Sequence, residues 1–151
     1  MEHENFEGKK MVNKTIYNED QSVRGKEVYS YDNASLYPSG SKYYDPQGAI
    51  MSTYKFSYQD SLKTKSEGYE GDGGELLRIE NFQYDEKGNM VRKTIYDSAG
   101  VKQRSFLFGH DAYGNEVKMV VLNANDEQVL SEAYEIVTST KAGEWIEKWG
   151  Y

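Results

Sequence analysis

The chain carries few residues that could perform acid–base or nucleophilic chemistry. Its 151 residues include no cysteine and two histidines, His3 and His110, and His110 stands directly before Asp111. A His–Asp pair can orient a general base in a nucleophilic triad. Other segments of the chain read Tyr-Asp at the corresponding positions, however, so a repeated structural role accounts for this pair.

Adjacent acids such as Glu19 with Asp20, or Asp85 with Glu86, are the remaining candidates for acid–base catalysis. Neighbouring side chains in a turn point apart and stay in water, so the arrangement offers no way of making one of them a general acid. Because no motif places a nucleophile, a base or an acid pair, we expect no catalytic residues and no enzymatic activity.

Among metal sites, the sequence most resembles a calcium-binding loop. Asn123, Asn125 and Glu127 alternate as the oxygen ligands of a calcium loop would, and Asp72 stands among glycines. Neither stretch has the D-x-[DN]-x-[DN]-G order, and the absence of cysteine excludes thiolate zinc sites and disulfides. We therefore interpret both stretches as solvated turns and expect neither a metal nor a cofactor.

Large aromatic residues at the C-terminus are the candidate ligand-binding residues. In a β-strand, Trp145, Trp149 and Tyr151 would share one face, with Glu147 between them. Such a row could stack on the sugar rings of a glycan, or it could cover the end of a thin core. The core interpretation is favoured because large aromatic side chains dominate the energetics of small cores.

The chain contains an internal repeat, and this repeat predicts the turns and strands that position these residues. Its best copies read Y-D-x-x-G-x-apolar, with the copy at Tyr96 one residue shorter before its apolar position. The clear copies begin at Tyr44, Tyr84 and Tyr96, and the degenerate ones at Tyr17, Tyr31, Tyr58, Tyr69, His110 and Leu122. A repeat built from turn residues and aromatics describes a scaffold and does not by itself define a function.

The turn in each repeat has a local physical explanation. The Asp carboxylate can bind the backbone two residues on, and a Gly three residues after it can close a type I turn with a G1 bulge. Asp and Gly keep this separation in four places: Asp45 with Gly48, Asp85 with Gly88, Asp97 with Gly100 and Asp111 with Gly114. The sequence therefore predicts an all-β fold, an antiparallel meander of roughly nine hairpin-connected strands.

Fourteen tyrosines and two tryptophans argue for a folded chain with a thin core lined by aromatics. In the segment 50–58, Ile50, Tyr54 and Phe56 share a dry face, whereas Met51 and Lys55 lie on a wet one. The sheet is expected to curl, to close partly or to form a single layer. We expect residues 1–12 to be a flexible lead-in, residues 13–151 to be one domain, and residues 61–75 to form its longest loop or a poorly formed repeat.

The charge and hydropathy of the chain exclude several classes of partner. Lys and Arg number 18 against 25 Asp and Glu, which gives a net charge of −7. This balance disfavours nucleic-acid binding through phosphate neutralisation. No apolar run approaches the roughly 18 residues of a membrane-spanning helix. Residues 1–10 lack the apolar core of a signal peptide, so the chain is expected to be cytoplasmic or to have lost its signal.

The Y-D-x-x-G-x-apolar motif resembles the YD repeat of the RHS-type family, which occurs in bacterial wall-associated and secreted proteins and in toxin-encapsulating shells. The resemblance extends from Tyr17 to Ile136 and is strongest between Phe82 and Leu122. Several copies depart from the motif: those at Tyr17, Tyr31, Tyr58 and Leu122 lack the Gly, and Glu70 replaces the Asp after Tyr69. The resemblance implies an antiparallel β scaffold that is often exported, and it supplies no catalytic residues.

We therefore expect a non-catalytic extracytoplasmic scaffold that binds a glycan or a protein through its surface. The alternative is a small acidic protein that neutralises a basic partner such as a toxin nuclease, with charge steering the association. Self-association through the sheet face or edge is a further option. Salt separates the first two functions, because stacking on a glycan is nearly insensitive to ionic strength and charge steering is not.

Overall fold

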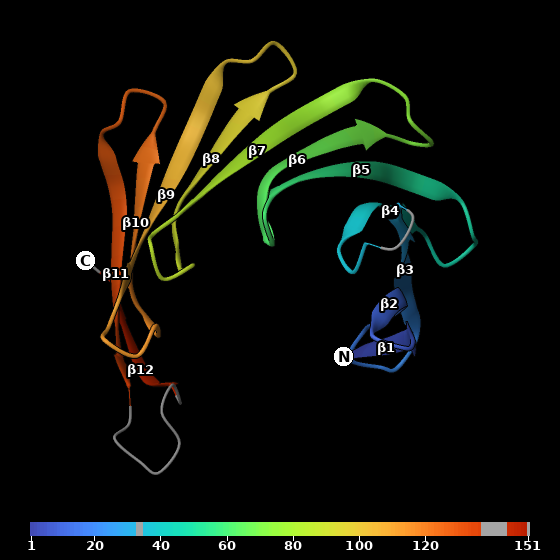
Figure 1. The fold of residues 1–151 in the computed structure, drawn as a ribbon, viewed down its shortest axis with the longest axis horizontal. Coiled ribbons are helices and arrows are strands. Elements are labelled where there is room, and N and C mark those ends of the chain that lie inside the picture. The colour runs from blue at the N-terminus through green and yellow to red at the C-terminus, as the bar shows by residue number, and fades with distance from the viewer. Residues whose placement is uncertain (33–34, 137–144, 151) are drawn as a thin grey trace. The chain divides into compact units, whose positions relative to one another are not determined.

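The computed structural model describes residues 1–32, 35–136 and 145–150, and side chains as far as residue 134. The described residues form twelve β-strands (Figure 1). They are β1 (Glu2–Glu7), β2 (Lys10–Tyr17), β3 (Val23–Tyr31), β4 (Pro38–Tyr44), β5 (Ile50–Gln59), β6 (Leu62–Glu70), β7 (Leu76–Tyr84), β8 (Met90–Asp97), β9 (Lys102–His110), β10 (Glu116–Asn123), β11 (Gln128–Ile136) and β12 (Trp145–Gly150).

The strands follow one another in the sheet in the order of the sequence, which confirms the antiparallel meander. Within the described part of the chain, β1 and β12 stand at the two ends of this order, so the sheet is open and not closed. The chain divides into two compact units, residues 1–79 and 80–151. The first unit contains β1 to β6 and the second contains β8 to β12 (Figure 1).

Two segments that the sequence indicated as irregular are strands. The expectation that residues 1–12 lie outside the sheet is wrong, because β1 pairs with β2 from Glu2 opposite Ile16 to Glu7 opposite Lys10. Polar cross-strand contacts join these two strands, including a 2.6 Å hydrogen bond from Asn5 Nδ2 to Asn13 Oδ1. Likewise, the segment 61–75 is not one long loop, because it contains β6. Whether residues 13–151 behave as one domain stays a prediction.

The repeated turns have the predicted geometry. Gly88 and Gly100 have φ values of 82° and 80°, which only glycine adopts without strain. The ladder shifts register beside these turns, for example between Ile95 and Tyr96, as a bulge requires. Asp126 takes the glycine position of the β10–β11 turn with a φ of 62°. Asp and Asn are the residues other than glycine that tolerate this conformation best.

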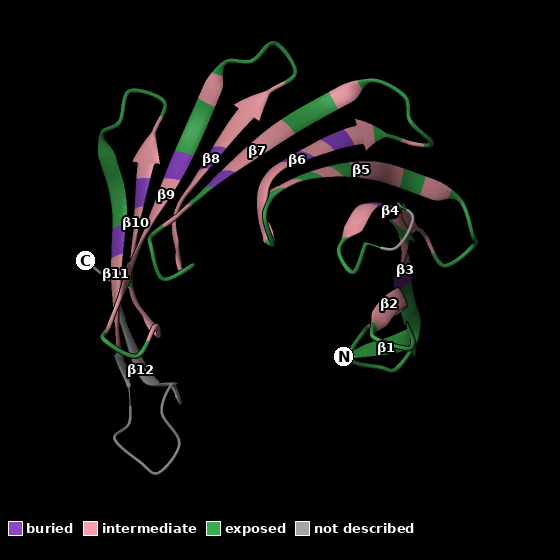
Figure 2. Ribbon diagram, viewed as in Figure 1, coloured by how far each residue is buried: buried purple, intermediate pink, exposed green. Residues whose placement is uncertain are grey.

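Buried positions form short stretches on several strands (Figure 2). Small residues occupy most of them. Among the described residues, Phe82 and Val121 are the buried apolar side chains. The buried polar residues are all small: Ser41, Ser66, Thr94, Ser105 and Ser131. Glycines are covered by aromatic rings from neighbouring strands, because a Cβ on Gly25 would collide with the Tyr43 ring and one on Gly68 would stand 3.2 Å from the Tyr54 ring. Tyrosines lying across small residues thus replace a layer of aliphatic packing.

The two faces of β5 differ as the sequence predicts. Tyr54 and Phe56 are half-buried, whereas Met51 and Lys55 are exposed. Paired residues on neighbouring strands share a face. The drier face of the first unit therefore also carries Ser41, opposite Tyr54.

Tyrosine hydroxyls on this sheet donate to carboxylates two residues earlier on the same strand. The three pairs are Tyr29 with Glu27 at 3.0 Å, Tyr69 with Glu67 at 3.1 Å and Tyr134 with Glu132 at 3.0 Å. Burial, followed by the Glu27 charge, raises the pKa of Tyr29 far above its usual value. These tyrosines therefore act as neutral hydrogen-bond donors that hold carboxylates on the sheet face.

Candidate functional site

The Asp side chains of the repeated turns accept hydrogen bonds from the backbone of the same turn. In the turn after β4, the backbone N–H groups of Gln47 and Ala49 both donate to Asp45 Oδ1 at 2.9 Å. Asp85, Asp97, Asp111 and Asn123 accept the same two bonds, from the residues two and four positions later, at 2.9 to 3.0 Å. Hydrogen bonds from Asn89 and Lys87, partly opposed by burial, lower the pKa of Asp85. The repeated acids thus build the turns.

His110 lies in a depression at one end of the second unit, which we call the Phe108 depression. It has a volume of about 410 Å³ and is lined by Asp85, Glu86, Lys87, Asn89, Val91, Phe108, His110 and Asp111. This lining includes no Ser, Thr, Tyr or Cys side chain that His110 could activate as a nucleophile. Phe106 stacks beside Phe108 with ring centroids 6.5 Å apart, and Lys93 lies 4.7 Å above the Phe106 ring. The depression therefore combines an aromatic floor with an acidic rim.

A second depression, the Tyr44 depression, lies on the first unit. It has a volume of about 360 Å³ and is lined by Thr15, Val23, Lys26, Val28, Tyr44, Asp45, Pro46 and Gly48. The turn after β4 supplies Asp45 and Pro46, and β2 and β3 supply the neighbouring side chains. Its apolar residues and single lysine form a shallow site for an apolar or ring-shaped group.

The polar groups of the β10–β11 turn are bonded to one another. Asn123 Oδ1 accepts the backbone N–H groups of Asn125 and Glu127, and Asn123 Nδ2 donates to Glu127 Oε2 at 3.3 Å. In the part of the chain that the structure describes, no three His, Cys, Asp or Glu residues are grouped so as to hold a metal ion. That the turn binds no calcium in solution stays a prediction.

The C-terminal aromatics can be placed by backbone alone. Trp145 and Trp149 belong to β12, where they pair with Ile136 and Ala133 of β11. Their side chains lie outside the described residues, as does Tyr151 entirely. The choice between a core lid and a ligand platform at these three residues therefore stays a prediction.

Sequence reasoning did not find either depression. Each is assembled from strands and turns whose lining residues are far apart along the chain, such as Thr15 and Pro46. The turn motif predicts the turn residues that line each depression. The strand residues of the lining come to lie beside them only through the register of the sheet.

No protein-family model matches this chain, and no curated protein matches it. Among solved structures it is similar to a porin-like protein from Bacteroides uniformis, with 11% identity and a TM-score of 0.46 over 84% of this chain and 54% of that one. It is also similar to a TarM mutant of S. aureus in complex with fondaparinux, alpha-GlcNAc-glycerol and UDP. That match has 12% identity and a TM-score of 0.32, and it covers 84% of this chain and 20% of that chain.

A third similar structure is TcdB2-TccC3-TEV, with 10% identity and a TM-score of 0.28 over 89% of this chain and 10% of that one. The chain thus spans about half the length of the porin-like protein and smaller parts of the other two. Among the described residues, no helix has the length and apolar character needed to cross a membrane.

Proposed function

We propose that this chain is a non-catalytic repeat scaffold of the YD type that binds a protein or a glycan through its surface, outside the cytoplasm. The observation that supports the proposal is the use of the repeated acids within their own turns, which leaves the side chains of the strand faces available for a ligand. The YD-type motif supports the extracytoplasmic placement, because the resembled proteins are often exported.

A binding panel tests this function. The chain is titrated with neutral and acidic oligosaccharides and with acidic and basic peptides, and each mixture is checked for reaction products. We expect saturable binding of at least one ligand class with no turnover. Replacing Tyr44 by Ala should weaken a glycan that stacks in its depression by about tenfold. The control is Tyr113→Ala, because Tyr113 is 83% exposed at a turn and lines neither depression. Turnover of a panel compound, or no binding at all, would contradict the proposal.

The second candidate is an acidic protein that neutralises a basic partner, and the Phe108 depression favours it. Three acids, Asp85, Glu86 and Asp111, stand around an aromatic floor that suits a lysine or arginine side chain. Glu86→Gln should then lower the affinity for a basic peptide severalfold, whereas Glu7→Gln, an exposed change on β1, should not. Raising the salt concentration should weaken this association strongly but should leave glycan stacking nearly unchanged.

A further inference from the structure

The wetter face of the first unit carries one lysine on each of four neighbouring strands. Lys26 on β3 pairs with Tyr44, two residues from Lys42. Lys42 on β4 pairs with Thr53, two residues from Lys55, and Lys55 on β5 pairs with Glu67, two residues from Lys65. Each step is therefore one strand across and two residues along the sheet. We call these four residues the lysine diagonal.

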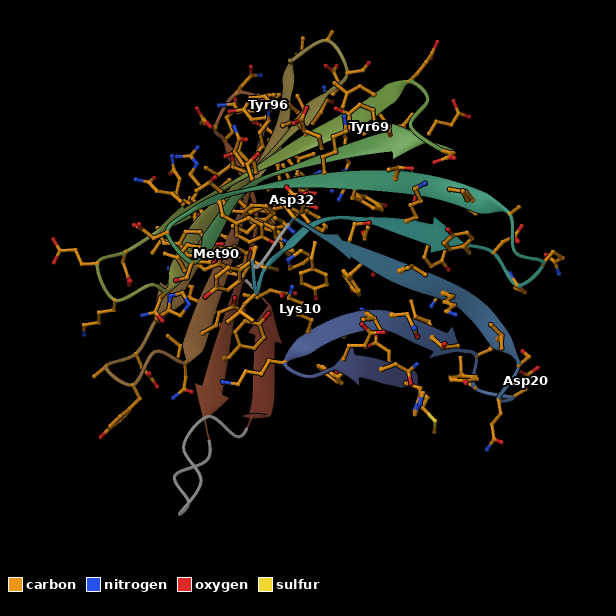
Figure 3. All side chains as sticks on the ribbon, turned by 45° about the vertical axis from the view of Figure 1, so that its right-hand side comes forward. Lys10, Asp20, Asp32, Tyr69, Met90 and Tyr96 are labelled. Carbon is orange, nitrogen blue, oxygen red and sulfur yellow. The ribbon has the colours of Figure 1, made fainter. Side chains whose placement is uncertain are left out.

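Strand geometry places the four lysines on the same face at a regular interval. Paired residues share a face, and a two-residue step along a strand returns to it. Strands about 4.8 Å apart and a two-residue rise of about 6.8 Å separate successive lysine Cα atoms by about 8 Å. Contacts on this face agree with the register, because Lys42 binds Asp72 at 2.7 Å and Lys55 lies 5.1 Å above the Tyr69 ring. Tyr69 is labelled on β6 in Figure 3.

Positive charge is concentrated on this face although the chain carries a net charge of −7. Lys26 and Lys55 are exposed, and the side chains of Lys42 and Lys65 are 39% and 40% exposed. Three acids offset part of the charge: Asp72, on Lys42, Glu67, which lies 3.4 Å from Lys65, and Asp45, which lines the same depression as Lys26. Arg24, exposed two residues before Lys26, adds to the same face. A surplus of positive charge therefore remains along the diagonal.

We propose that the lysine diagonal docks an extended acidic segment of a partner protein, with Glu or Asp at alternate positions. An extended peptide presents every second side chain on one side, about 6.8 Å apart, which is close to the step of the diagonal. Four alternate carboxylates can thus follow four successive lysines. The proposal rests on the proposed function, since it requires the strand faces to bind.

Peptide register provides the test. A labelled peptide with four Glu residues alternating with Ser is compared by fluorescence anisotropy, at about 50 mM salt, with a peptide of the same composition whose Glu residues are consecutive. In an extended chain the consecutive peptide presents only half of its carboxylates on one side. We expect the alternating peptide to bind about fivefold more tightly or better. Equal affinities for the two peptides, or no binding of the alternating one, would overturn the proposal.

Charge variants locate the site. The double change Lys26→Glu with Lys55→Glu should reduce the affinity for the alternating peptide by about tenfold or more. The matched control is Arg104→Glu with Lys118→Glu, two exposed basic residues of the second unit with the same change in net charge. Asp72→Asn should tighten binding by about twofold or threefold, because it releases Lys42 from its partner.

Equal losses in the two double variants would overturn the proposal, as would heparin or an oligonucleotide binding this face when neither peptide does. In either case the proposed function survives if a panel ligand binds elsewhere, for example in the Phe108 depression. The docking proposal and the proposed function fall together if no ligand of any class binds.

Discussion

At the residue scale, each repeated turn depends on one carboxylate or amide oxygen and one left-handed residue. Asp97 Oδ1 accepts the backbone N–H groups of Ala99 and Val101, and Gly100 donates its N–H to the Asp97 carbonyl at 3.1 Å. Asn123 makes the same two acceptor bonds with its amide oxygen. The shared requirement is therefore an oxygen acceptor, with or without charge, followed three residues later by a residue that tolerates positive φ.

Replacing Gly88 by Val should lower the free energy of unfolding by about 1 to 2 kcal/mol, because a β-branched residue resists positive φ. Lys87→Val is the matched control, since it places the same side chain one residue earlier in the same exposed turn. Urea denaturation of both variants measures the effect. Equal midpoints for Gly88→Val and the parent would contradict the bulged-turn geometry.

Stability should fall in acid as the turn carboxylates become protonated. Hydrogen bonds that Asn89 and Lys87 donate to Asp85 lower the pKa of this carboxyl group from its ordinary value of 3.8. For Asp111, burial raises the pKa, but hydrogen bonds from Asn115 and Tyr113 outweigh it and lower the pKa overall. A carboxyl group whose pKa is lower in the folded state stabilises the fold above its unfolded pKa and loses that contribution as pH falls through the folded one.

The double variant Asp85→Asn with Asp111→Asn should therefore lose less stability between pH 5 and pH 2 than the parent does, because an amide cannot be protonated in this range. The drop in melting temperature over that range measures it. A variant as acid-sensitive as the parent would place the acid sensitivity in other groups.

At the element scale, the strands pack by placing aromatic rings over small residues on neighbouring strands. Gly40 allows β4 to lie close to β5, since a Cβ there would collide with the Tyr54 carbonyl oxygen. Gly68, by contrast, is covered by the Tyr54 ring, and a Cβ there would stand 3.2 Å from Cε1. A ring can move by a few tenths of an ångström more easily than a paired backbone can.

Gly40→Ala should consequently destabilise the protein by about 1 to 3 kcal/mol, and Gly68→Ala by less than about 1 kcal/mol. Chemical denaturation of the two variants side by side gives the comparison. The packing account fails if Gly68→Ala proves to be the more harmful change.

The sequence predicts some elements better than others. Elements held by contacts between residues close in sequence are predicted well, whereas elements that depend on pairing with a distant strand are not. The turns at Asp85 and Asp97 are local, so their residues predict them directly. The strands β1 and β6 are polar and lack a clear alternation, and they form because a neighbouring strand pairs with their backbone. The lysine diagonal and the two depressions depend on register, which bulges such as that between Ser57 and Tyr58 shift by one residue.

At the scale of the whole molecule, an open meander has edge strands with unpaired backbone groups and faces exposed to solvent. β12 stands at one end of the strand order, and its aromatic residues are the site that the sequence proposes. If Trp149 covers a core, Trp149→Ala should cost about 3 to 5 kcal/mol of stability. If Trp149 contacts a ligand, stability should change by less than about 0.5 kcal/mol while ligand affinity falls. We expect the large loss, and an unchanged unfolding midpoint in urea would contradict that expectation.

The central claim is that the repeated turns build the scaffold and the strand faces bind the ligand. It is tested most directly by measuring unfolding free energy and ligand affinity on the same variants, two in turns (Gly88→Val, Asp97→Ala) and two on a strand face (Lys26→Glu, Tyr44→Ala). The account predicts that the turn changes lower stability but leave the affinity of the folded protein unchanged, whereas the face changes weaken binding with little loss of stability. Turn variants that lose ligand binding while unfolding at the parent's midpoint would contradict it.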